Sequence, residues 1–199
     1  MNLTLSTTTY SRLLILSAVS GACAVILFLT LVSGRQTLPV MSSCLPAFRD
    51  GGGPYYKPDS PFRTRIVPAG TEGKPMIIKG VVLSSDCSRS VPGAVIDIWQ
   101  ANESGSYEDE WYRGQVTADA EGNYEFETVM PRGYGEGTGY RPPHIHFKVF
   151  ADGREIVTSQ MFFDDVRGRE GFSDEYIVNL DDKPEQLIGT HHIVLPDFP

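Results

Sequence analysis

The sequence is poor in positive charge and has no sustained helical pattern. Its 199 residues include 17 lysines and arginines against 25 aspartates and glutamates, for a formal net charge of -8. No basic stripe is present that could neutralise the phosphates of a nucleic acid, so we expect no nucleic-acid partner. The hydrophobic content of 41% and the chain length suit one globular domain with a core.

In place of a helical period, apolar residues alternate with polar ones, which is typical of half-buried strands. We predict strands at residues 76–83, 94–100, 123–129, 144–150, 157–163 and 192–195. Turn sequences such as Val-Pro-Gly and Ala-Asp-Gly separate these segments. The pattern predicts an all-β fold in the form of a two-sheet β-sandwich.

One uncharged hydrophobic run, from Leu13 to Val32, does not follow this alternation. It is long enough to cross a bilayer as a hydrophobic helix and has arginines on both sides. An uncleaved anchor is slightly favoured, because a cleaved signal usually has a shorter apolar stretch; a cut before Arg35 is the alternative. Residues 1–35 are thus predicted to be a signal peptide or transmembrane anchor. The rest of the chain is expected outside the cytoplasm, as a secreted, periplasmic or membrane-anchored protein.

The segment that follows is rich in proline, glycine and serine. We predict an extended arm without regular structure at residues 36–63 and the sandwich domain at residues 64–199. Cys44 and Cys87 lie beyond the hydrophobic run in polar, turn-like contexts, which in an oxidising compartment predicts one disulfide. Two free buried thiols are the alternative.

The stretch RPPHIHFKVF carries the first candidate site. Alternation places His144 and His146 on one face of a strand, with Ile145, Phe147 and Val149 on the other. A His-x-His pair is a common metal-chelating geometry, but it could equally be a half-exposed strand face. No Cys, Asp or Glu nearby falls into a familiar zinc spacing with the pair.

Two tyrosines stand out because neither fits a core position. Tyr107 follows the second predicted strand in the loop ANESGSY, and Tyr134 lies in the glycine-rich loop PRGYGEG. Tyr124 differs, since it alternates with Phe126 and is most simply a core residue. A loop tyrosine by itself is more often a surface or hinge residue than a ligand.

Taken together, WQANESGSY, PRGYGEGTGYRPPHIHF and TSQMFF, with the preceding VPGAVIDIWQAN, resemble the intradiol ring-cleavage dioxygenases in order and spacing. This family contains protocatechuate 3,4-dioxygenase and catechol 1,2-dioxygenase. The resemblance covers Pro54 to Phe163 and weakens towards the C-terminus. It implies a transthyretin-like sandwich and an enzyme that cleaves a catechol-type ring between its two hydroxyl-bearing carbons with incorporation of O2. The chain looks more like the small exported or protocatechuate-type members, and a homo-oligomer stays open.

The resemblance also implies a cofactor, a non-haem Fe(III) ion bound by Tyr107, Tyr134, His144 and His146. Two phenolates and a hydroxide would balance the three charges of the ferric ion in a partly dry cavity. Tyr134 is implied to be both a ligand and the general base towards the substrate.

Further residues match the family pattern. Arg141 matches an arginine that stabilises carbanion character in the bound ring, and Gln160 a glutamine near the O2 and substrate pocket. Trp99 would shield the iron from solvent. Gln160 could equally face outward from its strand, and Trp99 could simply pack in the core. One of the tyrosines in GGGPYYKP is a candidate to line the substrate pocket, namely Tyr55 or Tyr56.

Departures from the family pattern leave some points open. Tyr140 rivals Tyr134 as a ligand, because it directly precedes Arg141, where the family often has tryptophan. Only three residues separate Tyr140 from His144 on a nearly extended segment, so reaching the same metal would require a tight reversal. His191 and His192 lie in no motif and are expected at the surface.

An acidic cluster beside Tyr107 is either solvated or faces the pocket. In the second case it would repel a carboxylated catechol and favour a neutral or polyphenolic one. The cluster comprises Glu103, Glu108, Asp109 and Glu110.

Two other classes of function compete with the dioxygenase. One is a non-catalytic transthyretin-like binding module at a membrane surface. The other is a copper or zinc enzyme that uses the histidine pair. Both leave the two loop tyrosines, Arg141 and Gln160 without a role.

Overall fold

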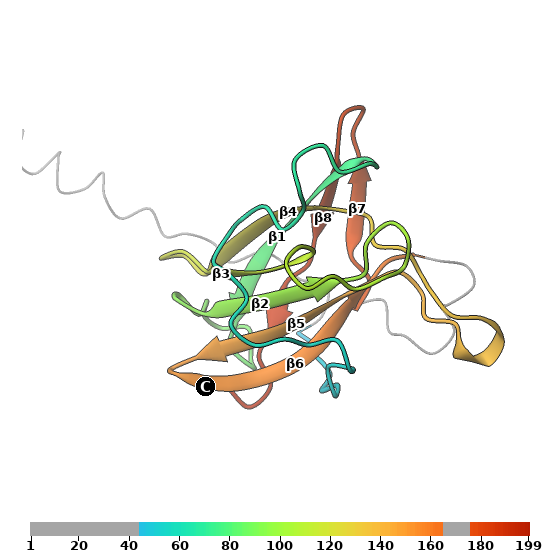
Figure 1. Ribbon diagram of the computed structural model, residues 1–199. Helices are drawn as coiled ribbons and strands as arrows, with labels where there is room; N and C mark the ends of the chain where they lie inside the picture. The colour runs from blue at the N-terminus through green and yellow to red at the C-terminus, as the bar shows by residue number, and fades with distance from the viewer. Residues whose placement is uncertain (1–43, 165–175) are drawn as a thin grey trace, which may run out of the picture. The chain divides into compact units, whose positions relative to one another are not determined.

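Two β-sheets face each other across one hydrophobic core in the computed structural model, which describes residues 44–164 and 176–199. One sheet has the order β4-β1-β8-β7, with β9 also paired to β1, and the other has the order β3-β2-β5-β6. Figure 1 shows the two layers. The all-β, two-sheet prediction is confirmed. The strands are β1 (Pro75–Leu83), β2 (Val95–Gln100), β3 (Arg113–Thr117), β4 (Asn123–Val129), β5 (His144–Ala151), β6 (Arg154–Phe162), β7 (Asn179–Asp182), β8 (Leu187–Thr190) and β9 (Ile193–Val194).

The predicted N-terminal hydrophobic helix lies outside the described residues. The helical element that lies wholly within the described ranges is a single 3-10 turn, η1 (Gly137–Gly139). No helix in this part of the chain is long and apolar enough to span a bilayer.

Strand alternation separates the core from the outer face of the sheet β3-β2-β5-β6. Ile98 of β2 and the pair Ile145 and Phe147 of β5 belong to the core cluster and are fully buried. Their neighbours Trp99 and His146 therefore point to the opposite face, away from the other sheet. This outer face carries the candidate site.

The arm covers that outer face. Residues 44–63 form no strand, and Figure 1 shows them crossing β5 and β6 as a coil. The backbone N–H of Asp50 donates to the carbonyl of Thr158 at 2.8 Å, and Phe62 forms an isolated bridge with Gln115. The described part of the arm, residues 44–63, is tied at its first residue by the disulfide Cys44–Cys87, whose Cα atoms lie 6.0 Å apart. The predicted disulfide is confirmed, whereas the domain boundary near Thr64 stays a prediction.

The expectation that the late histidines lie at the surface is wrong for His191. Its side chain is only 7% exposed, and its ring centroid lies 6.2 Å from that of Phe147. The carbonyl of His191 accepts a hydrogen bond from Tyr124 Oη at 2.7 Å and approaches Gly80 so closely that a Cβ there would lie 1.8 Å from it. This close approach requires glycine in β1.

His191 reaches the interior because the parallel ladder on β1 is interrupted. Pairing with β8 ends at Lys79 and Thr190, and pairing with β9 resumes at Val82 and Ile193. In the gap, the half-buried His192 accepts a hydrogen bond at Nδ1 from the backbone N–H of Val81, at 3.2 Å. A side chain thus replaces a backbone partner, which no local sequence pattern indicates.

We expect the burial of His191 to make the fold acid-sensitive. Burial, followed by the charge of His192, lowers the pKa of His191 from 6.5 to about 4. The unfolded chain takes up the proton first as the pH falls, so this contribution is complete above pH 6.5 and is lost between pH 6.5 and 4. The expected loss is about 3 kcal/mol. Urea unfolding of the protein and of His191→Leu at pH 7 and pH 4.5 measures it. An equal pH-dependent loss in both proteins would show that His191 is not responsible.

Candidate metal centre

A row of three side chains crosses the outer face of the sheet. Trp99 of β2 pairs with His146 of β5, and His146 pairs with Gln160 of β6. Directly paired residues of antiparallel strands place their side chains on the same face, so these three are neighbours. The Trp99 and His146 rings stack with centroids 5.0 Å apart and an interplanar angle of 2°. His144, two residues earlier, shares this face.

Two loops bring tyrosines onto this row. The Oη atom of Tyr107 lies 3.2 Å from Nε2 of His144 and 3.5 Å from Oη of Tyr134. The ring centroids of Tyr134 and His144 are 5.6 Å apart, and those of Tyr107 and His146 are 6.3 Å apart. The structure thus brings together all four side chains that the resemblance implies as ligands.

The Tyr107 loop is fixed from both sides. Asn102 begins the turn, and its side-chain oxygen accepts the backbone N–H groups of Ser104 and Ser106. The buried guanidinium of Arg113 donates to the carbonyl of Glu108, immediately after Tyr107, at 2.7 and 3.0 Å. Sequence reasoning missed Arg113, which lies in the unpredicted strand β3.

The arm closes over the same tyrosine. The ring of Tyr55, which is 44% exposed, stacks on that of Tyr107 at 4.2 Å with an interplanar angle of 8°. Tyr56 instead lies against Trp99, with centroids 4.9 Å apart. Gly53 lies beside His146, and a Cβ at this glycine would be in ordinary van der Waals contact with Cε1 of the imidazole, at 3.7 Å.

Tyr134 lies at the base of a glycine-rich hairpin. Its backbone exchanges two hydrogen bonds with Arg141, at 2.7 and 3.0 Å. Gly135, with φ of +82°, lets the chain turn away after Tyr134. Tyr140 lies across the hairpin, where its hydroxyl would be 2.5 Å from a Cβ at Gly133, and it lines a hollow with η1. Contact with Tyr107 and His144 is therefore made by Tyr134.

Burial keeps the imidazoles neutral. It lowers the pKa of His144 to about 4 and, together with the repulsion that protonation of both rings would cause, that of His146 to about 3. Nδ1 of His144 lies 2.6 Å from the carbonyl of Pro142, which can only accept, so Nε2 carries the lone pair that faces Tyr107. Burial and the hydrogen bond with Tyr134 raise the pKa of Tyr107. A cation at this position would be required to ionise Tyr107 at neutral pH.

The donor set fits a ferric ion. Two neutral imidazoles and two phenols supply nitrogen and hard oxygen donors, and the phenols can become anions that balance a trivalent charge. Nδ1 of His146 is buried without a hydrogen-bond partner in the described structure, so stacking on Trp99 orients this ring. Among the residues described, no three His, Cys, Asp or Glu side chains cluster in a metal-binding arrangement. The tyrosines must therefore complete any site on the histidine pair.

Arg141 and Gln160 are also in contact. Nη2 of Arg141 donates to Oε1 of Gln160 at 2.7 Å, and Gln160 is only 3% exposed. The Nε2 group of Gln160 donates in turn to a carboxylate of the arm, Asp50. Sequence reasoning missed Asp50, whose glycine-rich context gave no signal.

The acidic cluster beside Tyr107 has partners within the loops. Glu103 accepts a hydrogen bond from Tyr112, and Glu108 accepts one from Asn102. Asp109 forms an ion pair with Lys57 of the arm. These contacts bind the Tyr107 loop to the arm and to β3.

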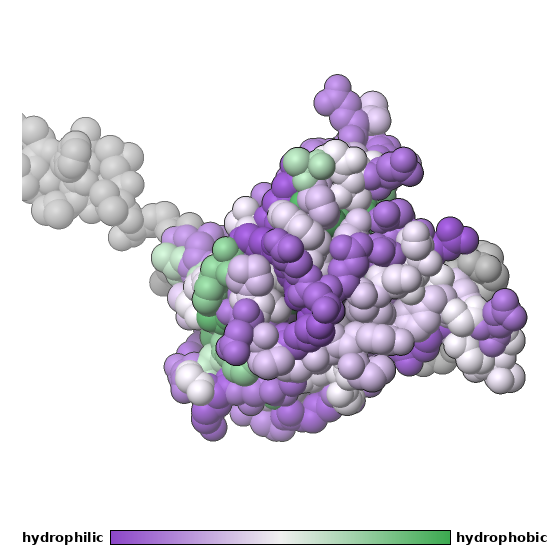
Figure 2. All heavy atoms as spheres, viewed as in Figure 1, coloured by the Kyte–Doolittle hydropathy of each residue, from purple (hydrophilic) through white to green (hydrophobic). Residues whose placement is uncertain are grey.

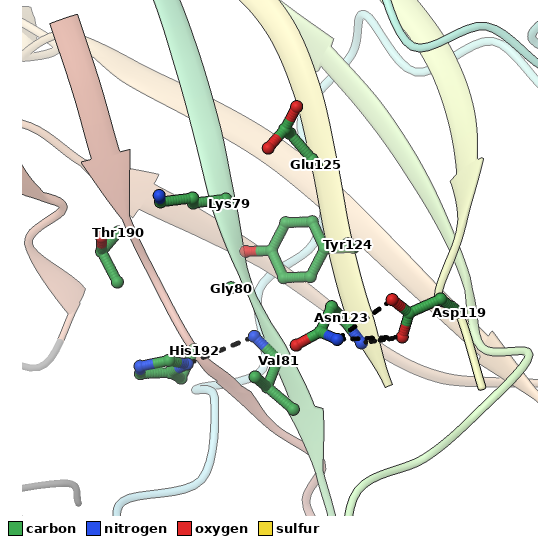
Figure 3. Close-up of a pocket in the computed structure, with 9 residues that line it drawn as sticks. All are labelled: Lys79, Gly80, Val81, Asp119, Asn123, Tyr124, Glu125, Thr190 and His192. Carbon is green, nitrogen blue, oxygen red and sulfur yellow. Dashed lines mark hydrogen bonds between the residues drawn. The ribbon is translucent and has the colours of Figure 1, made fainter. Parts of the chain in front are cut away.

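A second hollow lies on the other sheet, as Figure 3 shows, with a volume of about 400 Å³. Lys79, Glu125 and Thr190 line it, and His192 turns Nδ1 away from solvent to accept the Val81 N–H. None of the predicted site residues contributes to it. We therefore place the candidate centre on the sheet that the arm covers.

Comparison with known proteins identifies the family of the chain. The family described as Dioxygenase matches residues 52–195. A chlorocatechol 1,2-dioxygenase of Pseudomonas putida is 36% identical over 135 residues, 56% of this chain and 52% of that protein. Catechol 1,2-dioxygenase 1 of Acinetobacter lwoffii is 37% identical over 109 residues, 43% of this chain and 35% of that protein.

Among solved structures, the dioxygenase domain of a dioxygenase and carbohydrate-binding protein fusion from Streptomyces sp. SirexAA-E is similar. It superposes with a TM-score of 0.67 and 33% identity, and the match covers 75% of this chain and 97% of that domain. The chain spans about half the length of the P. putida relative, 52%. The family match extends over most of the described sandwich, including the row of site residues. The chain therefore belongs to the intradiol ring-cleavage dioxygenase family.

Proposed function

We propose that this chain is a non-haem Fe(III) dioxygenase that opens the ring of a catechol between its two hydroxyl-bearing carbons. The observation that carries the proposal is the convergence of Tyr107, Tyr134, His144 and His146 on the arm-covered face, where Tyr107 Oη lies 3.5 Å from Tyr134 Oη and 3.2 Å from His144 Nε2, and the His144 and His146 ring centroids are 4.8 Å apart. These four residues would hold the metal. When bound, a ferric ion would chelate the two catechol oxygens and make the ring reactive towards O2.

Tyr134 is the residue best suited to accept a proton from the substrate. It is only half-buried and lies at the base of a glycine-rich hairpin, whereas Tyr107 is fixed by the Arg113 contact and the Tyr55 stack. A phenolate at Tyr134 Oη would take the proton of one catechol hydroxyl. Tyr107 would remain a constant donor.

Arg141 supplies positive charge next to the bound ring. Its guanidinium is a cation, and Gln160 restrains its position. The charge would stabilise the electron-rich ring that forms when both hydroxyls are deprotonated. Trp99, stacked on His146 and fully buried, would exclude water from the metal.

The substrate is proposed to be a neutral catechol or polyphenol, with O2 as the second substrate. The relatives quoted above carry the names of catechol and chlorocatechol enzymes, which suits a ring without a carboxylate. The acidic residues beside Tyr107 have partners within the loops, with Asp109 paired to Lys57, so this preference rests on the relatives and not on repulsion by those carboxylates. Oxygen uptake with catechol, chlorocatechols and protocatechuate would rank these substrates.

We further propose that the enzyme works outside the cytoplasm. The Cys44–Cys87 disulfide supports this location, because such bonds persist in oxidising compartments. A membrane attachment through residues 13–32 and a homo-oligomer belong to the same proposal.

A non-catalytic binding module at a membrane surface is the main alternative. Figure 2 shows a mainly hydrophilic surface on the face in view, with small hydrophobic patches. The large hydrophobic side chains exposed in the described ranges are Leu45, Tyr55 and Phe62. Without a broad apolar patch on this face, docking of a protein or membrane there has little support.

Colour distinguishes these possibilities. Because tyrosinate bound to ferric iron absorbs visible light in a broad charge-transfer band, we expect the purified iron-loaded protein to be reddish and to consume O2 with catechol. A binding module or a zinc protein would be colourless, and a copper protein blue. A colourless protein that retains no added Fe(III) would contradict the proposal.

A further inference from the structure

Three polar side chains form a hydrogen-bonded chain from the arm to the segment that precedes β5. The carboxylate of Asp50 accepts a hydrogen bond from Nε2 of Gln160, and Oε1 of Gln160 accepts one from Arg141 at 2.7 Å. Both ends of one amide are thus used. The two outer members carry opposite charges, and Gln160 lies buried between them.

Asp50 is held firmly in this position. Its backbone N–H donates to the carbonyl of Thr158 at 2.8 Å, and its carboxylate accepts the backbone N–H groups of Gly51 and Gly52. Gly52 packs so tightly that a Cβ there would lie 3.1 Å from Cγ2 of Thr158. The arm therefore presents the carboxylate to β6 in one arrangement.

The charge of Asp50 determines which way the amide of Gln160 turns. Burial alone would raise the pKa of Asp50, but the hydrogen bonds from Gln160, Gly51 and Gly52 bring it below its usual value. An ionised carboxylate can only accept hydrogen bonds. Gln160 must then direct its NH2 group to Asp50, which leaves its oxygen for Arg141.

Arg141 depends on that oxygen. It is an exposed side chain with several rotatable bonds, and it follows the glycine-rich hairpin directly. A flexible guanidinium contributes to a reaction only if it is held in position. A neutral amide oriented by a half-buried anion gives a strong hydrogen bond without neutralising the guanidinium by direct ion pairing.

We propose that Asp50 is a positioning residue, which orients the Gln160 amide and through it holds the Arg141 guanidinium at the substrate. The inference rests on the function proposed above, because only there does Arg141 meet a substrate. On this proposal, the arm both covers the sheet and supplies the carboxylate that positions Arg141.

The first test is kinetic and uses the iron-loaded protein. In Asp50→Asn the new amide can donate as well as accept, so nothing fixes the orientation of Gln160. We expect kcat for catechol to fall about tenfold while KM changes less than about twofold, since Arg141 acts on charge that develops during the reaction. Asp152→Asn removes the same charge from the exposed β5–β6 turn and should leave kcat unchanged. An unchanged kcat in Asp50→Asn, or loss of its iron, would overturn the inference.

The second test measures whether the effects of substituting Asp50 and Gln160 on kcat are additive. Gln160→Met keeps the length of the side chain but removes both hydrogen bonds. If Asp50 acts through Gln160, adding Asp50→Asn to Gln160→Met should lower kcat no further. The same tenfold loss in both backgrounds would mean that Asp50 acts by another route.

A third measurement does not depend on turnover. Protein loaded with Ga(III), a diamagnetic trivalent ion that does not undergo redox chemistry, allows NMR of the side-chain amides. We expect two well-separated proton resonances for Gln160 Nε2, which move towards the values of exposed amides in Asp50→Asn. Unshifted resonances would refute the orientation. If the unmodified enzyme consumes no O2 with any catechol, the proposed function fails, while this spectrum still decides the role of Asp50.

Discussion

Tyr107→Phe and His146→Ala are each expected to lose most of the bound iron. Tyr107→Phe removes one of the two phenolates that would balance the ferric charge, and His146→Ala removes one of the two imidazole donors, so each variant leaves a coordination position of Fe(III) unfilled. Loss of an outer-shell partner already costs about 10–100-fold in metal affinity, so loss of a direct donor should cost more than about 100-fold. Iron content after gel filtration with a weak chelator measures the effect.

The fold should survive both substitutions, which allows a clean comparison. Tyr107 lies in a loop, and His146 is on the outer face of the sheet, outside the core cluster. His192→Gln provides the matched control, because it removes a half-buried histidine from the other sheet. Iron content that is unchanged in Tyr107→Phe and in His146→Ala would refute the ligand assignment. Iron loss in His192→Gln alone would show that the metal binds near the other sheet, and that the site assigned to the arm-covered sheet is wrong.

The alternation of apolar residues was sufficient to predict the strands that build the core. β1, β2 and β5 each bury one side-chain row in the interior, and period two is clear in their sequences. β3, β7 and β8 were not predicted, because the segments RGQVT, NLDD and LIGT are short and show little alternation. Their strand conformation comes from pairing with neighbours, which is a tertiary effect.

The site also combines residues that the sequence predicts with residues that only the tertiary fold brings together. The histidine pair and the loop tyrosines could be predicted because motif order along the chain identifies the family. The row Trp99, His146, Gln160 required the register of three strands, which alternation does not determine. Asp50 lies 110 residues from Gln160, so no local pattern could connect them. His191 was misplaced because a gap in the ladder, and not its own sequence, buries it.

Tyr134→Phe is expected to lower the rate of ring cleavage severely while leaving part of the colour. The substitution removes Oη, and with it the atom that would accept the proton of a catechol hydroxyl. Loss of a positioned base typically costs about 10²–10⁴-fold in rate. Tyr107 remains, held by the Arg113 hydrogen bond to the neighbouring Glu108 carbonyl and by the Tyr55 stack, so the visible band should weaken and shift without vanishing. Single-turnover kinetics and the visible spectrum of the iron-loaded variant measure both effects.

Tyr140→Phe is the control that distinguishes a base from a packing residue. Tyr140 belongs to the same hairpin as Tyr134, but its hydroxyl lies against Gly133 and not among the four donors. We expect this variant to keep the band and most of the activity. Within the hairpin, Tyr134 is paired with Arg141. Tyr140 precedes Arg141 by one residue, so its side chain lies on the opposite side of the hairpin from that of Arg141. A normal Tyr134→Phe together with a bleached, inactive Tyr140→Phe would transfer both the ligand and the base role to Tyr140, and would require the hairpin to invert when iron binds.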